Sequence, residues 1–76
     1  LSGKIFVITG SLNHYKNRDE LVGVIESMGG KVSGSVSAKT SYLINNDTQS
    51  SSSKNQKAQK LNIPIISEED FINMIS

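Results

Sequence analysis

The residues with the clearest chemical potential are a Thr-Gly pair and two cations. Thr9 and Gly10 end an apolar run, and Lys54 follows four consecutive serines, residues 50–53. A hydroxyl beside a glycine amide, which has no side chain to block approach, suits a phosphate oxygen. Lys54 opens a predicted helix whose free amides favour an anion, and Arg18 can form paired hydrogen bonds to the same group. These residues together predict a phosphate site.

A plainer interpretation of the same residues stays open. Thr9 and Gly10 can simply end a strand, with Arg18 and Lys54 solvated. Lys57 is either a further phosphate contact or a solvated cation, and Lys60 is expected to be solvated. If the site binds DNA through its phosphates, affinity will depend on salt and little on base sequence.

Other kinds of site are rejected on composition or context. The chain has no Cys and a single His, His14, which excludes disulfides, thiolate zinc sites and His-rich metal sites. Segment 34–40 resembles a nucleotide-binding loop, but it lacks a glycine before Lys39 and leads into a strand. The acidic run 68–70 suits the first turn of a helix by its charge alone. We therefore expect no catalytic group and no metal site.

The composition predicts one small domain, residues 1–76. Hydrophobic residues make up 36% of the chain and charged residues 20%, which is typical of a globular domain. The net charge of +1 does not by itself indicate nucleic-acid binding, so that inference depends on where the cations lie. The longest apolar run is 5–8, far short of a membrane span, and no secretion signal opens the chain. Because it starts at Leu1, we expect a piece of a larger protein.

The hydrophobic pattern predicts alternating strands and helices. Strands are expected at 4–9, 31–33, 41–44 and 65–66, and helices at 18–28, at about 53–61 and after residue 67. The first strand is apolar on both faces and should be fully buried. This order favours a parallel sheet with helices on both faces. The short connection between the second and third strands suits a hairpin or a crossover equally well.

Local signals define where the helices begin, end and pack. Asn17 and Ser67 are predicted N-caps, the latter with Asp70 in a capping-box position. Gly29 and Gly30 are assigned a structural role, as a helix stop and a point of close packing. The positions expected to face the core are Leu21, Val22, Val24, Ile25, Met28, Ala58, Leu61, Phe71, Ile72 and Ile75.

Six segments, in order and spacing, resemble a BRCT domain over nearly the whole chain. They are residues 1–10, 18–21, 29–33, 37–44, 53–58 and 63–71. The resemblance is greatest to the C-terminal BRCT domain of bacterial NAD-dependent DNA ligases. It implies an α/β, three-layer fold whose four-stranded parallel sheet has the order 2-1-3-4. Helices 1 and 3 would lie on one face of the sheet and helix 2 on the other.

The resemblance also implies a function. Phosphate-binding BRCT domains have a Ser/Thr-Gly pair and a Lys where this chain has Thr9, Gly10 and Lys54. Those that recognise 5′-phosphorylated DNA ends have an Arg near the position of Arg18. The implied role is a non-catalytic module that helps a ligase bind nicked or broken DNA in replication and repair. The parent ligase would use NAD, magnesium and a structural zinc, and would be cytoplasmic; the module itself would need no cofactor and would be a monomer.

Alternatives remain at this point. The module could instead dock replication or repair proteins, including through a phosphorylated motif. Its parent could be a clamp-loader large subunit or a proofreading exonuclease, with a nuclear location if it is eukaryotic. Two departures from the family pattern are visible: Phe71 stands where many members have Trp, and loop 45–49 lacks the glycines of ligase relatives.

Overall fold

Seven secondary-structure elements form the chain, and a computed structural model describes residues 2–47 and 52–75. Part of the serine run and of loop 45–49 therefore lies outside the described residues. In chain order the elements are β1 (Ile5–Ile8), α1 (Arg18–Ser27), β2 (Lys31–Ser33), β3 (Tyr42–Ile44), α2 (Ser53–Lys60), β4 (Ile65–Ile66) and α3 (Glu68–Ile75).

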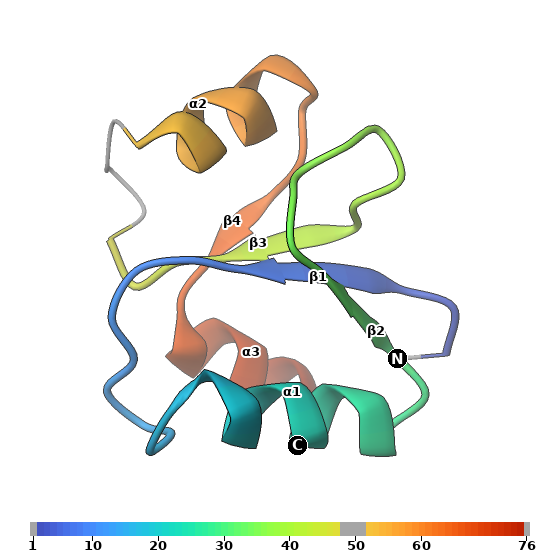
Figure 1. Ribbon diagram of the computed structural model, residues 1–76, viewed down its shortest axis with the longest axis vertical. Helices are drawn as coiled ribbons and strands as arrows, with labels where there is room; N and C mark the ends of the chain where they lie inside the picture. The colour runs from blue at the N-terminus through green and yellow to red at the C-terminus, as the bar shows by residue number, and fades with distance from the viewer. Residues whose placement is uncertain (1, 48–51, 76) are drawn as a thin grey trace.

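The four strands form one parallel sheet of order β2-β1-β3-β4, which confirms the predicted fold. The connection from β2 to β3 is thus a crossover past β1 and not a hairpin. Helices α1 and α3 cover one face of the sheet and α2 covers the other (Figure 1). All strands run the same way, so the carboxyl ends of β1 and β3 meet at one edge.

The core consists of two buried clusters, one on each face of the sheet. Alternation along β1 sends Phe6 and Ile8 toward α1 and α3, and Val7 toward α2. Phe71 of α3 is fully buried and packs edge-on against Phe6, with ring centroids 5.6 Å apart. The first cluster is completed by Leu21, Ile25 and Ile44, and the second contains Val36, Leu43, Ala58 and Ile63.

Each helix begins at a polar cap. Asn17 Oδ1 accepts a hydrogen bond of 2.9 Å from the Glu20 amide at the start of α1. Ser52 Oγ accepts one of 3.3 Å from the first turn of α2. Ser67 Oγ accepts one of 3.1 Å from the Asp70 amide, which confirms the predicted capping box. The caps define the residue at which each of the three helices begins.

The prediction that two residues, Met28 and Leu61, face the core is wrong. Met28 is 39% exposed and Leu61 is 37% exposed. Both are C-cap residues, lying just past the last turn of α1 and α2 where the chain bends away from the helix axis. The helical periodicity that predicted their burial no longer applies there. After Met28, Gly29 has φ +88°, and a Cβ on it would lie 3.3 Å from Cα of Ser2.

Candidate functional site

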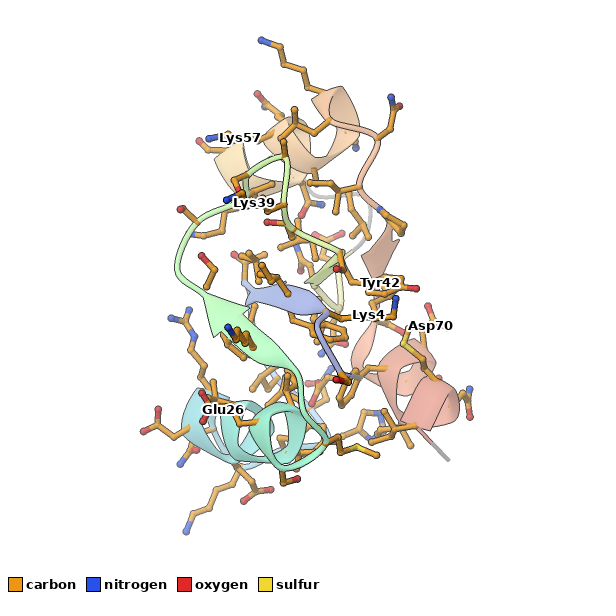
Figure 2. All side chains as sticks on the ribbon, turned by 90° about the vertical axis from the view of Figure 1, so that its right-hand side faces the viewer. Lys4, Glu26, Lys39, Tyr42, Lys57 and Asp70 are labelled. Atoms are coloured by element: carbon orange, nitrogen blue, oxygen red, sulfur yellow. The ribbon has the colours of Figure 1, made fainter. Side chains whose placement is uncertain are left out.

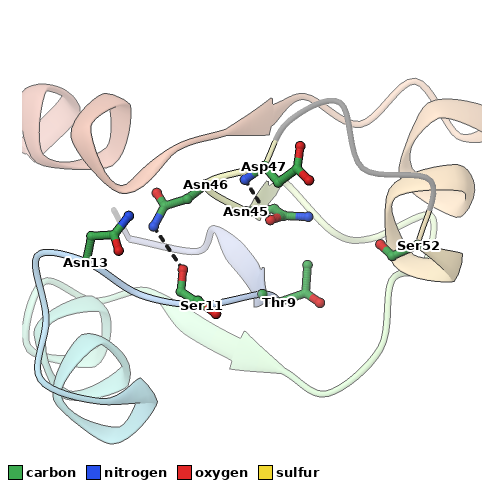
Figure 3. Close-up of a pocket in the computed structure, with 8 residues that line it drawn as sticks. Thr9, Ser11, Asn13, Asn45, Asn46, Asp47 and Ser52 are labelled. Carbon is green, nitrogen blue, oxygen red and sulfur yellow. Dashed lines mark hydrogen bonds between the residues drawn. The ribbon is translucent and has the colours of Figure 1, made fainter.

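A polar pocket of about 330 Å³ opens at the edge where the carboxyl ends of β1 and β3 meet (Figure 3). In open parallel sheets this edge is where ligands usually bind. Three segments form its walls: the turn after β1, the turn after β3 and the cap of α2. The lining residues are Thr9, Gly10, Ser11, Asn13, Asn45, Asn46, Asp47 and Ser52.

Gly10 is required at the pocket by its backbone and by its neighbour. Its φ is +79°, a left-handed conformation that side chains disfavour. A Cβ at this position would lie 2.7 Å from Oδ1 of Asn45. The turn after β1 therefore comes close to the turn after β3 only because Gly10 has no side chain. The same lack of a side chain leaves the Gly10 backbone open to a ligand.

A buried pair of amides joins the turn after β3 to α2. Asn45 Nδ2 donates to Asn55 Oδ1 at 2.8 Å, and Asn55 Nδ2 donates to the Asp47 carbonyl at 3.3 Å. Asn45 Oδ1 in turn accepts from the Asp47 amide at 3.0 Å. Asn45 is 4% exposed and Asn55 is fully buried. This network sets the position of the α2 cap, and so of Ser52, against the rest of the pocket.

The opposite wall is held by a buried carboxylate from α3. Glu68 accepts hydrogen bonds from the backbone amides of Asn13, His14 (2.9 Å) and Tyr15 (3.0 Å). The Glu68 carboxylate also accepts a hydrogen bond from Nδ2 of Asn46. In return, Oδ1 of Asn46 accepts a hydrogen bond of 2.9 Å from the backbone amide of Glu68. Glu68 therefore does more than favour the helix dipole. It fixes the shape of the loop between β1 and α1 and ties that loop to the turn after β3.

The surroundings of Glu68 shift two pKa values. Burial works to raise the pKa of Glu68, but the hydrogen bonds from Asn13, Asn46, His14 and Tyr15 outweigh it, and the net pKa is lowered. The pKa of the Tyr15 hydroxyl is raised by burial and then by the nearby negative charge of Glu68. Glu68 is therefore charged at neutral pH and remains an acceptor for the loop.

The structure brings some of the predicted site residues together and leaves others outside. Thr9, which is half-buried, and Gly10 both line the pocket. Lys54 is half-buried in the first turn of α2, two residues after the lining residue Ser52, but does not itself line the pocket. Arg18 is exposed at the first residue of α1, and Lys57 is exposed in the second turn of α2. Neither of these two residues lines the pocket.

The lining side chains are neutral donors and acceptors, apart from one acid. Among the lining residues that the structure describes, Asp47 is the charged one, and it is exposed. Hydroxyls, amides and backbone N–H groups can all donate to an oxyanion. The positive charge that a phosphate needs must come from the rim, where Lys54 is the nearest candidate along the chain.

Sequence reasoning missed three residues that hold the pocket walls in place: Asn45, which lines the pocket, and Asn55 and Glu68, which support it from behind. A signal for two of them was present. Asn55 lies three residues before Ala58, and Glu68 three residues before Phe71, so each extends the buried stripe of its helix by one turn. Asn45, at the end of β3, offers no comparable pattern.

In residues 2–47 and 52–75, no helix is long and apolar enough to cross a membrane. No cluster of three or more His, Cys, Asp or Glu side chains in them is arranged to hold a metal ion.

Comparison with known proteins gives one family and many relatives. A family model described as the BRCA1 C Terminus (BRCT) domain matches residues 1–75. The chain is 62% identical over all of its 76 residues to a DNA ligase of Lachnoclostridium phytofermentans. It is 61% identical over 71 residues, 93% of the chain, to a DNA ligase of Ruminiclostridium cellulolyticum. The chain spans only 12% and 11% of the length of these two curated relatives.

Proposed function

Because the chain belongs to the BRCT domain family, we propose that it is a non-catalytic module of a bacterial NAD-dependent DNA ligase. The module helps the ligase hold nicked or broken DNA during replication and repair, through the DNA backbone or a terminal 5′-phosphate. The identity to bacterial DNA ligases supports this parent over a clamp loader or a proofreading exonuclease. The ligase would act in the cytoplasm and supply the NAD, magnesium and zinc chemistry outside this chain.

The observation that carries the proposal is the meeting of Thr9 and Gly10 with the capped start of α2 at one pocket. The Thr9 hydroxyl and the exposed backbone of Gly10 offer donors to a phosphate oxygen. The amides at the start of α2 add the positive end of the helix dipole. Hydrogen bonds to a charged group contribute about 1.5–3 kcal/mol each, enough for a few of them to hold a phosphate group.

The rim cations complete the proposed site. Asp47 places negative charge on the wall, so donors alone would bind a dianion weakly. Lys54, in the first turn of α2, offsets that charge and attracts the phosphate. Arg18, at the start of α1, forms paired hydrogen bonds to the terminal phosphate, and Lys57 is an auxiliary phosphate contact. Replication or repair proteins could meet the module on other faces without competing for this pocket.

The test is a comparison of two duplexes that differ by one group. Fluorescence polarisation with a 5′-phosphorylated duplex and its 5′-hydroxyl twin should show tighter binding of the phosphorylated end. Binding of both should weaken as salt rises. In an NMR titration with the phosphorylated duplex, amides 9, 10 and 54 should shift. Shifts confined to α3, with those three amides silent, would overturn the proposal in favour of a protein-docking module.

A further inference from the structure

The two helical layers carry charges of opposite sign. Helix α2 has three lysines and no acidic residue, a formal charge of +3. Helices α1 and α3 together have six acidic residues and one basic residue, a formal charge of −5. The sheet separates these layers (Figure 1). A net charge of +1 for the whole chain hides this separation.

A loop distant in sequence adds a cation to the α2 side. The connection between β2 and β3 covers the α2 face, because its Val36 belongs to the same buried cluster as Ala58 of α2. Lys39 is exposed on this loop, held in a turn by Thr40. The Thr40 amide donates to the Ser37 carbonyl at 3.0 Å, and Thr40 Oγ1 accepts from the Ser37 amide at 3.0 Å. Thr40 is 6% exposed, so the turn is anchored to the body of the protein.

The side chains follow the same division. Figure 2 shows Lys39 and Lys57 at the α2 end of the molecule, and Glu26 and Asp70 at the end formed by α1 and α3. Lys39 and Lys57 are exposed and Lys54 is half-exposed. Among residues 2–47 and 52–75, the contact found between a basic and an acidic side chain is that of His14 Nε2 with Glu69 Oε1, 3.6 Å apart, on the acidic side. No described carboxylate therefore forms an ion pair with Lys39, Lys54 or Lys57.

We propose that Lys39, Lys54 and Lys57 form a basic face along which the phosphate backbone of duplex DNA lies. This inference rests on the proposed function and extends it from one phosphate to a path. The DNA strand whose 5′ end lies in the pocket continues over α2 and over the loop that carries Lys39. The acidic layer of α1 and α3 repels the duplex, so the charge separation also sets its orientation.

The composition of the face favours DNA over a protein partner. Lysines are depleted from the centres of protein–protein interfaces, which are built on aromatic and apolar side chains. Lysine side chains are among the groups that most often contact the phosphates of DNA. An acidic protein surface would also attract lysines, so the test must distinguish it from DNA.

The test separates the slope of salt dependence from the preference for a phosphorylated end. Each phosphate contact contributes about 0.9 to the slope of log affinity against log salt. Lys39→Gln and Lys57→Gln should each make that slope shallower by about 0.9, and the double variant by about twice as much. In Lys39→Gln the affinity ratio between the phosphorylated and hydroxyl duplexes should stay at its wild-type value, because Lys39 is not part of the proposed phosphate site. Thermal melting checks that the variants remain folded.

Lys4→Gln is the matched control, since it removes the same charge from an exposed residue before β1, at the other edge of the sheet. Its salt slope should equal that of the wild type. An unchanged slope in the double variant would overturn the basic face, and the proposed function would still stand if the wild type prefers the phosphorylated duplex. Binding to poly-glutamate, a stand-in for an acidic protein surface, is measured alongside. If the double variant loses poly-glutamate binding but keeps its DNA binding, the DNA-binding face is overturned in favour of an acidic protein partner. Absence of any DNA binding by the wild type would overturn the proposed function itself.

Discussion

The side chain of Asn45 donates a 2.8 Å hydrogen bond to the side chain of Asn55, ten residues further along the chain. Both residues are buried, and they join the carboxyl end of β3 to the first turn of α2. The segment between them is polar and includes the serine run, so its own sequence does not fix where α2 begins in space. The pair does so, and it thereby sets the distance between Thr9 and the start of α2.

Replacing Asn55 with Ala should destabilise the fold. The change leaves Asn45 Nδ2 buried without its acceptor, which costs about 1–3 kcal/mol. We expect that decrease in the free energy of unfolding, measured by urea denaturation. Gln59→Ala, at an exposed position of the same helix, should change it by less than about 0.5 kcal/mol. Equal stability of the two variants would contradict the role given to the amide pair.

Two glycines should respond to alanine in opposite directions. Gly10→Ala puts a side chain at positive φ and drives a Cβ into Asn45, so we expect a loss of about 1–3 kcal/mol. Gly23 lies inside α1 with no atom within 4 Å of a built Cβ. Gly23→Ala should therefore stabilise the protein by about 0.5–1 kcal/mol. Thermal melting of both variants checks the signs, and a neutral Gly10→Ala would contradict the close approach.

Glu68 should make stability depend on acid pH. Its pKa is lowered in the folded protein, so its contribution is complete above the pKa of an unfolded glutamate, about 4.3. That contribution is lost as the pH falls through the lower folded value. Glu68→Gln should cost about 3 kcal/mol at pH 7, because its amide N–H groups would face the N–H groups that now donate to the carboxylate. It should also remove the loss of stability that the wild type shows as the pH falls below about 4.3. Glu69→Gln, at an exposed position, is the control in urea unfolding at each pH.

The proposed phosphate site predicts an order of effects on DNA binding. Lys54→Glu should remove most of the affinity, because it places a negative charge where the start of α2 attracts one. Thr9→Val should cost less, since the Gly10 amide and the cations remain. Arg18→Ala should weaken phosphorylated ends more than internal duplex, and Lys60→Ala should change little. Polarisation titrations at fixed salt measure the affinity of each variant. A loss of affinity in Lys60→Ala as large as that in Lys54→Glu would contradict the proposed site.

The 76-residue chain by itself should be catalytically inert. The residue pattern offers no nucleophile with an activating base, and the pocket lining that the structure describes consists of hydroxyls, amides, a glycine and one exposed acid. We expect no sealing of nicked duplex and no hydrolysis of ATP or NAD by the pure chain, measured by gel and by product release. Turnover that persists through purification and is abolished by a point change in this chain would contradict this expectation.

Much of the fold could be predicted because its signals are local. The apolar run at 5–8 predicted a buried strand, and three of its four residues, Phe6 to Ile8, are buried. The spacing of Leu21 and Ile25 predicted the buried face of α1, which is confirmed. The crossover between β2 and β3 was different. Its short connection fits a hairpin as well, so residue pattern alone left it open, and the family resemblance implied the answer.

The walls of the pocket could not be predicted in the same way. Asn45, Asn55 and Glu68 are polar residues in polar surroundings, and such residues are usually exposed. Their burial depends on partners from distant segments, such as the loop amides that meet Glu68. Thr9 and Gly10 were found because their residue types suit a ligand, whereas the supporting residues matter through contacts that exist only in the folded chain.

The outer strands of the sheet have a consequence for self-association. β2 has three residues and β4 has two. An exposed sheet edge can pair with the edge of another molecule, and short edge strands are one way in which proteins prevent it. The few unpaired backbone groups on β2 and β4 offer little for such pairing. We therefore expect the chain to stay monomeric.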